Sequence, residues 1–506
     1  MYWDMVSDTD FLSFSVFSVS EAVFCVFFCE ILCILCIPWL LQAKPKYLLF
    51  RTNHRLLEQN LHGVNVHIFA RTTYKISERK GSGSAGDSET LNSVPARTMN
   101  TMIELQPSPK TYCGQTERSK TPEETLACIE PLTKIAGITR VADITDLDRI
   151  KIPVYSCIRP TAADGAISVY NGKGGTEAEA RVAGIMEGIE RYSAEAMPRD
   201  LAMISYDMLS LTEDAVNPVD LILPKAVDPR AELPWVDAWD IANNCSVKVP
   251  LCAVMHPNPH YMPSLFRSSS NGIASGNTLE EAVFYALTEV IERDAWSLVE
   301  TTRVTGPAVT GLTGAAAEML AKFTAAGVEV TLKDITSDIG VPTIAAVADD
   351  VTLKDPRLLT IGMGTHTNPE IAVIRALSEV AQSRATQIHG AREDATIAAF
   401  REMMGYDRVK RMNAYWFRAE GTRDFSEIAG CATPDFRTDI LAILDRLRAA
   451  GLDRVLVADL TDPDLGVPVA RVIVPGLECF TIDNERRGKR CIDAERRRLH
   501  RPKSAV

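Results

Sequence analysis

The chain has 506 residues, of which 46% are hydrophobic and 24% charged, and its formal net charge is −12 at pH 7. This composition is ordinary for a globular protein with a sizeable core, and the length allows roughly two to four domains. The acidic balance argues against a nucleic-acid partner, because binding nucleic acid requires a basic surface.

Residues 11–41 are mostly Phe, Val, Cys, Ile and Leu, with only Glu21 and Glu30 charged. The stretch is long enough to span a bilayer. Acidic residues precede it where a signal peptide has basic ones, so no signal peptide is predicted. If the segment inserts, the basic residues after it place the N-terminus outside and the rest of the chain in the cytoplasm.

The twelve cysteines are scattered along the chain. Outside the N-terminal stretch they form no Cys-x-x-Cys pair and no Cys/His cluster, so neither zinc nor a disulfide framework is predicted. Within that stretch Cys25, Cys29, Cys33 and Cys36 share one helix face, but their apolar surroundings argue against a metal site. We therefore expect free thiols in a reducing cytoplasm.

Residues 43–98 lack a clear periodicity and contain Gly-Ser-Gly-Ser-Ala-Gly, a composition typical of flexible linkers. We expect residues 1–98 to be an N-terminal extension, which is either a start assigned too far upstream or a membrane anchor. A continuous globular pattern begins at Met99 and predicts one domain over residues 99–480. A charged, solvated tail is predicted over residues 481–506.

The globular part mixes helical and strand patterns, which predicts an α+β fold. Thr121 and Pro122 mark a helix start, since proline suits the first helical position. Further elements are predicted as follows: strands at 154–158, 166–170, 342–348, 454–458 and 469–474, strands and loops over 198–265, a helix followed by a strand over 310–333, a turn at 361–366, and a helix at 440–450.

Two segments, residues 171–195 and 271–294, each contain a glycine-rich turn that leads into an amphipathic helix. A third helix is predicted at 372–388. The glutamates at positions 187, 289 and 379 recur in similar surroundings, 102 and then 90 residues apart. The sequence therefore predicts internally repeated glycine-turn/helix units around one shared site.

The helices of the first two units place several carboxylates on one face and apolar side chains on the other. These carboxylates belong to Glu187, Glu190, Glu281, Glu289 and Glu292. Like charges so close together need a cation, and Mg²⁺ binds carboxylate oxygens while keeping room for waters and phosphates. Glycine turns at helix N-termini favour anions. With Arg191 and Arg293 nearby, the pattern indicates a nucleotide held through magnesium.

The motifs together resemble the YcaO family. They are N-G-K-G at 171–174, E-x-x-E-R at 187–191, S-N-G at 270–272, G-N-T at 276–278, E-x-x-E-R-D at 289–294 and R-V-I-V-P-G at 471–476. The resemblance covers roughly residues 110–480. It implies a YcaO-like fold and ATP- and Mg-dependent phosphorylation of a peptide backbone amide.

The resemblance also implies roles for individual residues, with no residue assigned to catalysis. Glu187, Glu190, Glu281, Glu289 and Glu292 are implied as Mg–ATP ligands, and Asn277, Arg293 and Arg471 as nucleotide or phosphate contacts. Arg118 and Thr125 replace a Lys/Ser pair that contacts ATP in the family. Ala183 stands where the family often has serine, which removes one hydroxyl contact.

The body of the chain is most similar to the methanogen branch of the family. That branch thioamidates a glycine in the α subunit of methyl-coenzyme M reductase, usually with a partner called TfuA that supplies sulfur. The resemblance thus implies an enzyme that acts on this protein substrate with a TfuA-like partner, and it favours a homodimer, since the family is often dimeric. A cytoplasmic location is expected from the free thiols.

Two alternatives stay open. One is an azoline-forming cyclodehydratase, although the chain ends in Arg-Pro-Lys-Ser-Ala-Val and lacks the Pro-x-Pro-x-Pro tail common in such enzymes. The other is an accessory factor for ribosomal-protein methylthiolation. An intact set of clustered glutamates argues against a non-catalytic scaffold, because without a cation these carboxylates would repel one another.

Overall fold

A computed structural model describes residues 102–195, 201–392, 396–418 and 421–500. The extension predicted over 1–98, with its apolar segment and its four cysteines, lies outside these residues. None of the helices described is both long and apolar enough to cross a membrane. The cysteines in the described ranges are free thiols.

Strands in the described residues form four sheets, in which neighbouring strands are antiparallel except for the pair β10–β14. The smallest is a hairpin of β1 (Tyr112–Cys113) and β2 (Glu117–Arg118). A three-stranded sheet has the order β3 (Arg140–Asp143), β4 (Val154–Ile158), β5 (Val169–Lys173).

The two larger sheets have six and five strands within the described residues. The first has the order β6 (Met203–Ile204), β7 (Leu233–Asp240), β15 (Leu456–Asp459), β16 (Val469–Ile473), β9 (Ile273–Ser275), with β8 (Cys245–Pro250) paired to β7. The second has the order β13 (Thr360–Thr365), β12 (Thr343–Asp349), β11 (Glu329–Asp334), β10 (Ala308–Thr310), β14 (Thr422–Asp424).

Helices connect and cover these sheets. They are α2 (Pro122–Ile129), α3 (Glu177–Ala194), α4 (Tyr206–Leu209), α5 (Leu251–Val254), α6 (Leu279–Thr302), α7 (Gly314–Ala325), α8 (Pro369–His389), α9 (Thr396–Met404), α10 (Tyr406–Met412), α11 (Ala414–Phe417), α12 (Phe436–Ala449) and α13 (Lys489–His500). Helix α2 begins as predicted, with Thr121 and Glu124 forming a capping box and Pro122 in the first turn.

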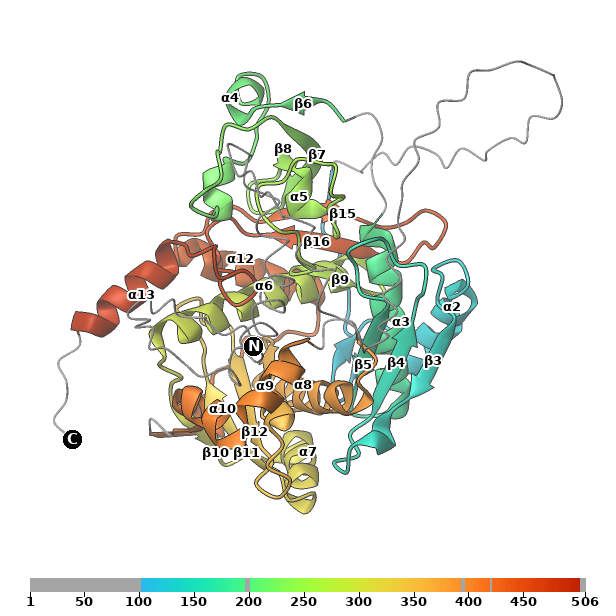
Figure 1. Ribbon diagram of the computed structural model, residues 1–506. Helices are drawn as coiled ribbons and strands as arrows, with labels where there is room; N and C mark the ends of the chain where they lie inside the picture. Colours follow the sequence, from blue (N-terminus) through green and yellow to red (C-terminus); the bar gives the residue numbers. More distant parts are fainter. Residues whose placement is uncertain (1–101, 196–200, 393–395, 419–420, 501–506) are drawn as a thin grey trace, which may run out of the picture. The chain divides into compact units, whose positions relative to one another are not determined.

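Three strand–helix units form a closed ring. Strands β5, β9 and β13 lead directly into α3, α6 and α8. Each helix packs on its own strand and also on the strand of another unit: α3 on β9, α6 on β13, and α8 on β5 (Figure 1). The three helices therefore surround one common region. That the units arose by internal duplication stays a prediction.

Helix α6 is buried on both faces. Its apolar side chains pack with α12, β15 and β16 in one core cluster. The face that carries the carboxylates is also covered, and Glu281 and Glu292 are only 1% and 3% exposed. Strands β9 and β16 (Figure 1) and β13 all pack against α6, so Glu281 and Glu292 face other parts of the chain, while the Glu289 side chain stays partly exposed.

Glycines allow α3 and α8 to lie directly on their strands, β5 and β13. A Cβ atom on Gly172 would come within 2.0 Å of the backbone nitrogen of Gly184, and one on Gly364 within 2.1 Å of the Ala372 carbonyl oxygen. The prediction of a turn at 361–366 is therefore wrong: these glycines belong to strand β13. In the same way, residues 171–173 extend β5 and leave a shorter turn before α3.

The C-terminal residues also differ from the prediction of a solvated tail. They form α13, whose Cys491 is fully buried. Arg490 makes a bidentate ion pair with Asp294 of α6, with both nitrogen–oxygen distances at 2.9 Å. This helix was not predicted from the sequence because most of its residues are charged, although Arg490 and Cys491 attach it to the rest of the chain.

Candidate functional site

The three helices of the ring carry their polar residues at matching distances from their N-caps, Thr176, Thr278 and Asn368. The eleventh residue after the cap is Glu187, Glu289 or Glu379, and the fourteenth is Glu190, Glu292 or Gln382. Because the helices surround one region, these side chains approach one another across the ring.

On α3, Arg191 pairs with both glutamates: it lies 3.3 Å from Glu187 and 3.1 Å from Glu190. Glu190 also accepts a 3.1 Å hydrogen bond from the backbone N–H of Ser275 in β9. Burial raises the pKa of Glu190 to about 8 against the effect of Arg191, and the nearby Glu187 and Glu289 raise it further. Glu190 is therefore a carboxylate that a cation would stabilise in its ionised form.

On α6, Arg293 lies 3.9 Å from Glu289 and 3.8 Å from Glu292. Burial raises the pKa of both carboxyls, that of Glu292 to about 7. The Oε2 atom of Glu292 is buried and has no hydrogen-bond partner among the described residues. Its counterparts on the other two helices, Glu190 and Gln382, both bond a strand of another unit, so Glu292 is the member of the set with an unused oxygen.

On α8, the negative charge of Glu379 is balanced by an ion pair with a lysine. Glu379 accepts a 2.7 Å ion-paired hydrogen bond from Lys173 of β5. Burial alone would raise the pKa of Glu379, but Lys173 and Arg293 outweigh it and the pKa is lowered. Gln382 donates to the carbonyl oxygen of Asn171, which fixes α8 against β5.

Cations approach the same carboxylates from further elements. Arg471 of β16 is 6% exposed, and its NH1 donates to the Ser269 carbonyl at 2.8 Å while its Nε has no partner in the described chain. Burial lowers the pKa of Arg471 to about 10, and Glu289 acts against this effect. Buried carboxylates with raised pKa values and an arginine with an unpaired N–H suit a ligand that carries both a cation and an anion, such as magnesium bound to phosphates.

Glu281, at the start of α6, has a separate set of contacts. Its carboxylate accepts hydrogen bonds from the backbone and hydroxyl of Ser119 at 3.0 and 2.7 Å, and it pairs with Arg118 at 3.2 Å. Asn277 donates to it at 3.3 Å and accepts from the Thr125 hydroxyl at 3.0 Å. The predicted contacts Arg118, Thr125, Asn277 and Glu281 thus form one group, which the N-terminal hairpin completes.

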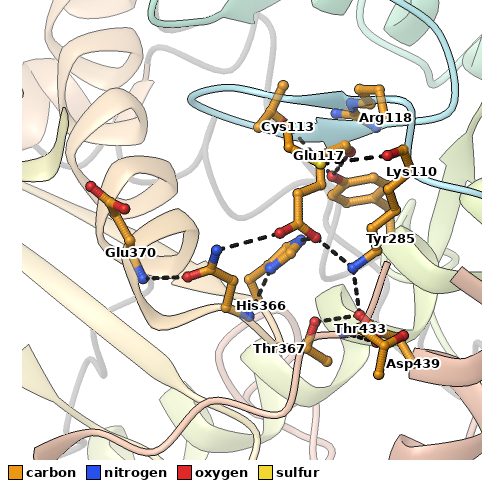
Figure 2. A network of polar contacts seen from close by, with 12 residues as sticks. Lys110, Cys113, Glu117, Arg118, Tyr285, His366, Thr367, Glu370, Thr433 and Asp439 are labelled. Carbon is orange, nitrogen blue, oxygen red and sulfur yellow. Dashed lines mark hydrogen bonds and ion pairs between the residues drawn. The ribbon is translucent and has the colours of Figure 1, made fainter. Parts of the chain in front are cut away.

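A buried ionic network holds that hairpin in place (Figure 2). Lys110 Nζ lies 2.5 Å from a carboxylate oxygen of Glu117 and 2.6 Å from one of Asp439. Tyr285 of α6 donates to the Glu117 carbonyl at 2.6 Å, and the Arg118 guanidinium stacks on the Tyr285 ring at 3.9 Å. The hairpin is therefore fastened to both α6 and α12 directly beside the Glu281 group.

The five glutamates predicted as one metal set do not form a single cage. Among the described residues, no three Asp, Glu, His or Cys side chains converge closely enough to hold a metal ion by themselves. The assignment of individual glutamates as ligands stays a prediction.

The turn before α3 was predicted to bind an anion, but its N–H groups are already bonded. The Glu179 carboxylate accepts from Gly175 N at 2.7 Å and from Thr176 N at 3.2 Å. Sequence reasoning missed Ser119, Lys173 and Ser275 as partners of the glutamates. Their partners are distant in sequence, although Lys173 lies within the N-G-K-G motif itself.

Comparison with known proteins agrees with these observations. Residues 171–478 match the family model described as YcaO cyclodehydratase, ATP- and Mg²⁺-binding. An uncharacterized protein of Methanothermobacter thermautotrophicus is 52% identical over 377 residues, which cover 73% of this chain and 97% of that protein. An uncharacterized protein in the tfuA 3′ region of Rhizobium leguminosarum bv. trifolii is 35% identical and covers 72% of this chain and 89% of its own length.

Among solved structures, YcaO from Methanopyrus kandleri bound with AMPPCP and Mg²⁺ matches with a TM-score of 0.66 and 29% identity, over 76% of this chain and 98% of that one. The α+β fold predicted from the sequence is confirmed. ATP and Mg²⁺ are also confirmed as cofactors, since the matching family is an ATP- and Mg²⁺-binding one. The chain belongs to the YcaO family.

Proposed function

We propose that this protein uses ATP to activate a peptide backbone amide and converts it to a thioamide. The proposed substrate is a glycine in the α subunit of methyl-coenzyme M reductase, and a TfuA-like partner delivers the sulfur. The observation that carries the ATP-dependent step is the ring of α3, α6 and α8, where buried carboxylates of raised pKa meet arginines.

In the proposed reaction, sulfide adds to the amide carbon and the amide oxygen takes the γ-phosphoryl group of ATP. That oxygen then leaves as phosphate, and a C=S bond replaces C=O. The sulfide proton ends on the phosphate, so the products are thioamide, ADP and phosphate. Bound Mg²⁺ supplies charge neutralisation for the phosphates. The residues of the chain contribute by positioning the nucleotide and by excluding water from buried carboxylates.

Two relatives agree with the methanogen branch and with a TfuA-like partner, from which we propose thioamidation. The relative from Methanothermobacter thermautotrophicus is 52% identical over nearly its whole length. The Rhizobium relative is named for its position in the tfuA 3′ region, which supports a TfuA-like partner. The description of the family as cyclodehydratase favours the azoline-forming reaction as the second candidate.

The product of the reaction decides between the two candidates. Purified protein is incubated with ATP, Mg²⁺, sulfide and a peptide that carries the reductase glycine site, with and without a TfuA-like protein. Thioamidation replaces one oxygen by sulfur, whereas azoline formation on a cysteine- or serine-containing peptide removes one water. Mass spectrometry distinguishes the two. ATP-dependent loss of water with no sulfur gain under either condition would overturn the thioamide proposal.

Binding of Mg–ATP should release protons near neutral pH. Burial raises the pKa of Glu190 to about 8 and that of Glu292 to about 7, so both carboxyls are partly protonated at pH 7. A bound cation favours the ionised form and displaces these protons. We expect calorimetry at pH 7 in buffers of different ionisation enthalpy to show proton release that disappears by pH 9.5, and affinity to fall as the pH drops from 8 to 6. Equal apparent enthalpies in all buffers at pH 7 would contradict the proposal that Glu190 and Glu292 lose protons to a bound cation.

A homodimer is proposed from the family resemblance. Light scattering on the purified protein tests it, because a dimer doubles the measured mass. The monomeric mass of the full chain is 55.6 kDa.

A further inference from the structure

Arg375 on α8 is a positively charged side chain that lies near several carboxylates without forming an ion pair with any of them in the described residues. It is the seventh residue after the N-cap Asn368, the position that Tyr285 occupies on α6. Burial raises the pKa of Glu289 and Glu292, and the positive charge of Arg375 is one of several that oppose this rise; it also contributes to the lowered pKa of Glu379. Arg375 therefore lies within electrostatic range of the carboxylates that two of the ring helices contribute.

Arg375 nevertheless pairs with none of these carboxylates. Among the described residues it makes no ion pair within 4.0 Å, and its buried Nε has no hydrogen-bond partner. Glu379 is already neutralised by Lys173 at 2.7 Å, and Glu289 and Glu292 are nearest to Arg293. The fork of N–H donors on Arg375 is thus not needed to balance the charge of the protein.

The guanidinium of Arg375 contacts an aromatic ring. Its guanidinium lies 5.2 Å from the centre of the Tyr285 ring, the ring on which Arg118 also stacks. Tyr285 is held in turn by the Glu117 carbonyl, as Figure 2 shows. A cation–π contact of this kind contributes about 1 kcal/mol and leaves the N–H groups free to donate. Arg375 is therefore held in one place with unused donors.

A guanidinium with unused donors, within electrostatic range of a carboxylate that has an unpartnered oxygen, suits one kind of ligand. Planar N–H pairs match phosphate oxygens, and the unpaired Oε2 of Glu292 matches the cation that accompanies them. We propose that Arg375 binds a phosphate oxygen of ATP and stabilises the charge on the phosphoryl group during its transfer. This inference rests on the proposed ATP-dependent function and adds to the nucleotide site the helix α8, on which no nucleotide contact was predicted from the sequence.

Two variants test this role by binding as well as by activity. Arg375→Gln removes the charge and the fork, and Arg375→Lys keeps the charge alone. Loss of a charge-assisted hydrogen bond lowers affinity by roughly 10–100-fold. We expect that loss for a non-hydrolysable ATP analogue with Mg²⁺ in Arg375→Gln, a smaller loss in Arg375→Lys, and unchanged affinity for adenosine in both. The melting temperature without nucleotide should stay close to that of the wild type.

Arg384 provides a matched control on the same helix. It is fully buried and pairs with Asp148 at 2.7 Å and with Asp350 at 3.1 Å. Arg384→Gln should therefore lower the melting temperature and leave discrimination between the ATP analogue and adenosine unchanged. A purely structural role for Arg375 would give the same pattern, and that result would overturn the inference.

The assays separate this inference from the function on which it rests. Wild-type protein that binds ATP more tightly than Arg375→Gln but yields no thioamide would refute the proposed product and support the Arg375 contact. Wild-type and Arg375→Gln proteins with equal affinity and turnover would refute the contact and leave the function supported. Wild-type protein that binds no ATP would refute both.

Discussion

Replacing Glu292 by glutamine should lower ATP hydrolysis on the order of 10²–10³-fold, the size of effect typical when one preorganised electrostatic group is removed from an active site. Glu292 is 3% exposed and has a carboxylate oxygen without a partner. Glutamine has the same shape but neither the charge nor the second oxygen that a cation requires. A phosphate-release assay at saturating ATP and Mg²⁺ measures the effect.

The same variant should not destabilise the protein. Burial raises the pKa of Glu292 to about 7, well above the range of an exposed glutamate. The protonated carboxyl of Glu292 therefore contributes fully to the free energy of unfolding at low pH, and this contribution is lost as the pH rises through 7. Glutamine stays neutral, so Glu292→Gln should melt at or above the wild-type temperature at pH 8 and close to it at pH 5. Thermal unfolding without nucleotide at both pH values checks this.

Glu300, two turns further along α6, provides the opposite control. It is also buried, but it accepts hydrogen bonds from Trp296 and Trp416, both at 3.1 Å, and pairs with Arg303. Glu300→Gln should lower the melting temperature with little change in nucleotide affinity. If Glu292→Gln instead loses stability and keeps ATP hydrolysis, Glu292 is a structural residue and no ligand.

Local patterns in the sequence predicted α2, α3, α6 and α8, because the signals for a helix lie within a few residues. The capping box at Thr121 and the amphipathic runs of α3, α6 and α8 need no distant partner to be recognised. Strand β13 was missed because Gly362 and Gly364 are typical of a turn when read alone. Only the close approach of α8 explains why glycine stands there.

The partners of the individual glutamates could not be predicted from the sequence. A helical wheel gives the direction of a side chain but not its height along the axis. Glu281 and Glu289 share a face but are about 12 Å apart along the helix, at 1.5 Å per residue. Glu281 accordingly finds Arg118, 163 residues away in sequence, and Glu379 finds Lys173, 206 residues away. No local pattern indicates such pairs.

The second large expected effect is a loss of stability when the ionic network beside the Arg118 hairpin is broken. Lys110 is the buried cation between Glu117 and Asp439, and its side chain is only 1% exposed (Figure 2). Burial would lower the pKa of Lys110, but Asp439 and Glu117 outweigh it and keep the amine charged. Lys110→Met would leave two carboxylates buried without their cation, and breaking such a pair costs about 3–5 kcal/mol. Denaturant unfolding measures this loss.

Nucleotide binding should weaken together with stability in Lys110→Met, because the hairpin places Arg118 and Ser119 on Glu281. Adding Glu117→Gln removes one of the uncompensated charges, so the double variant should regain part of the lost stability. Lys134→Met, which removes an exposed lysine, is the control and should unfold like the wild type. A Lys110→Met protein as stable as this control would show that the network is dispensable. A Lys110→Met protein that is destabilised but binds ATP normally would show that the hairpin reaches Glu281 without it.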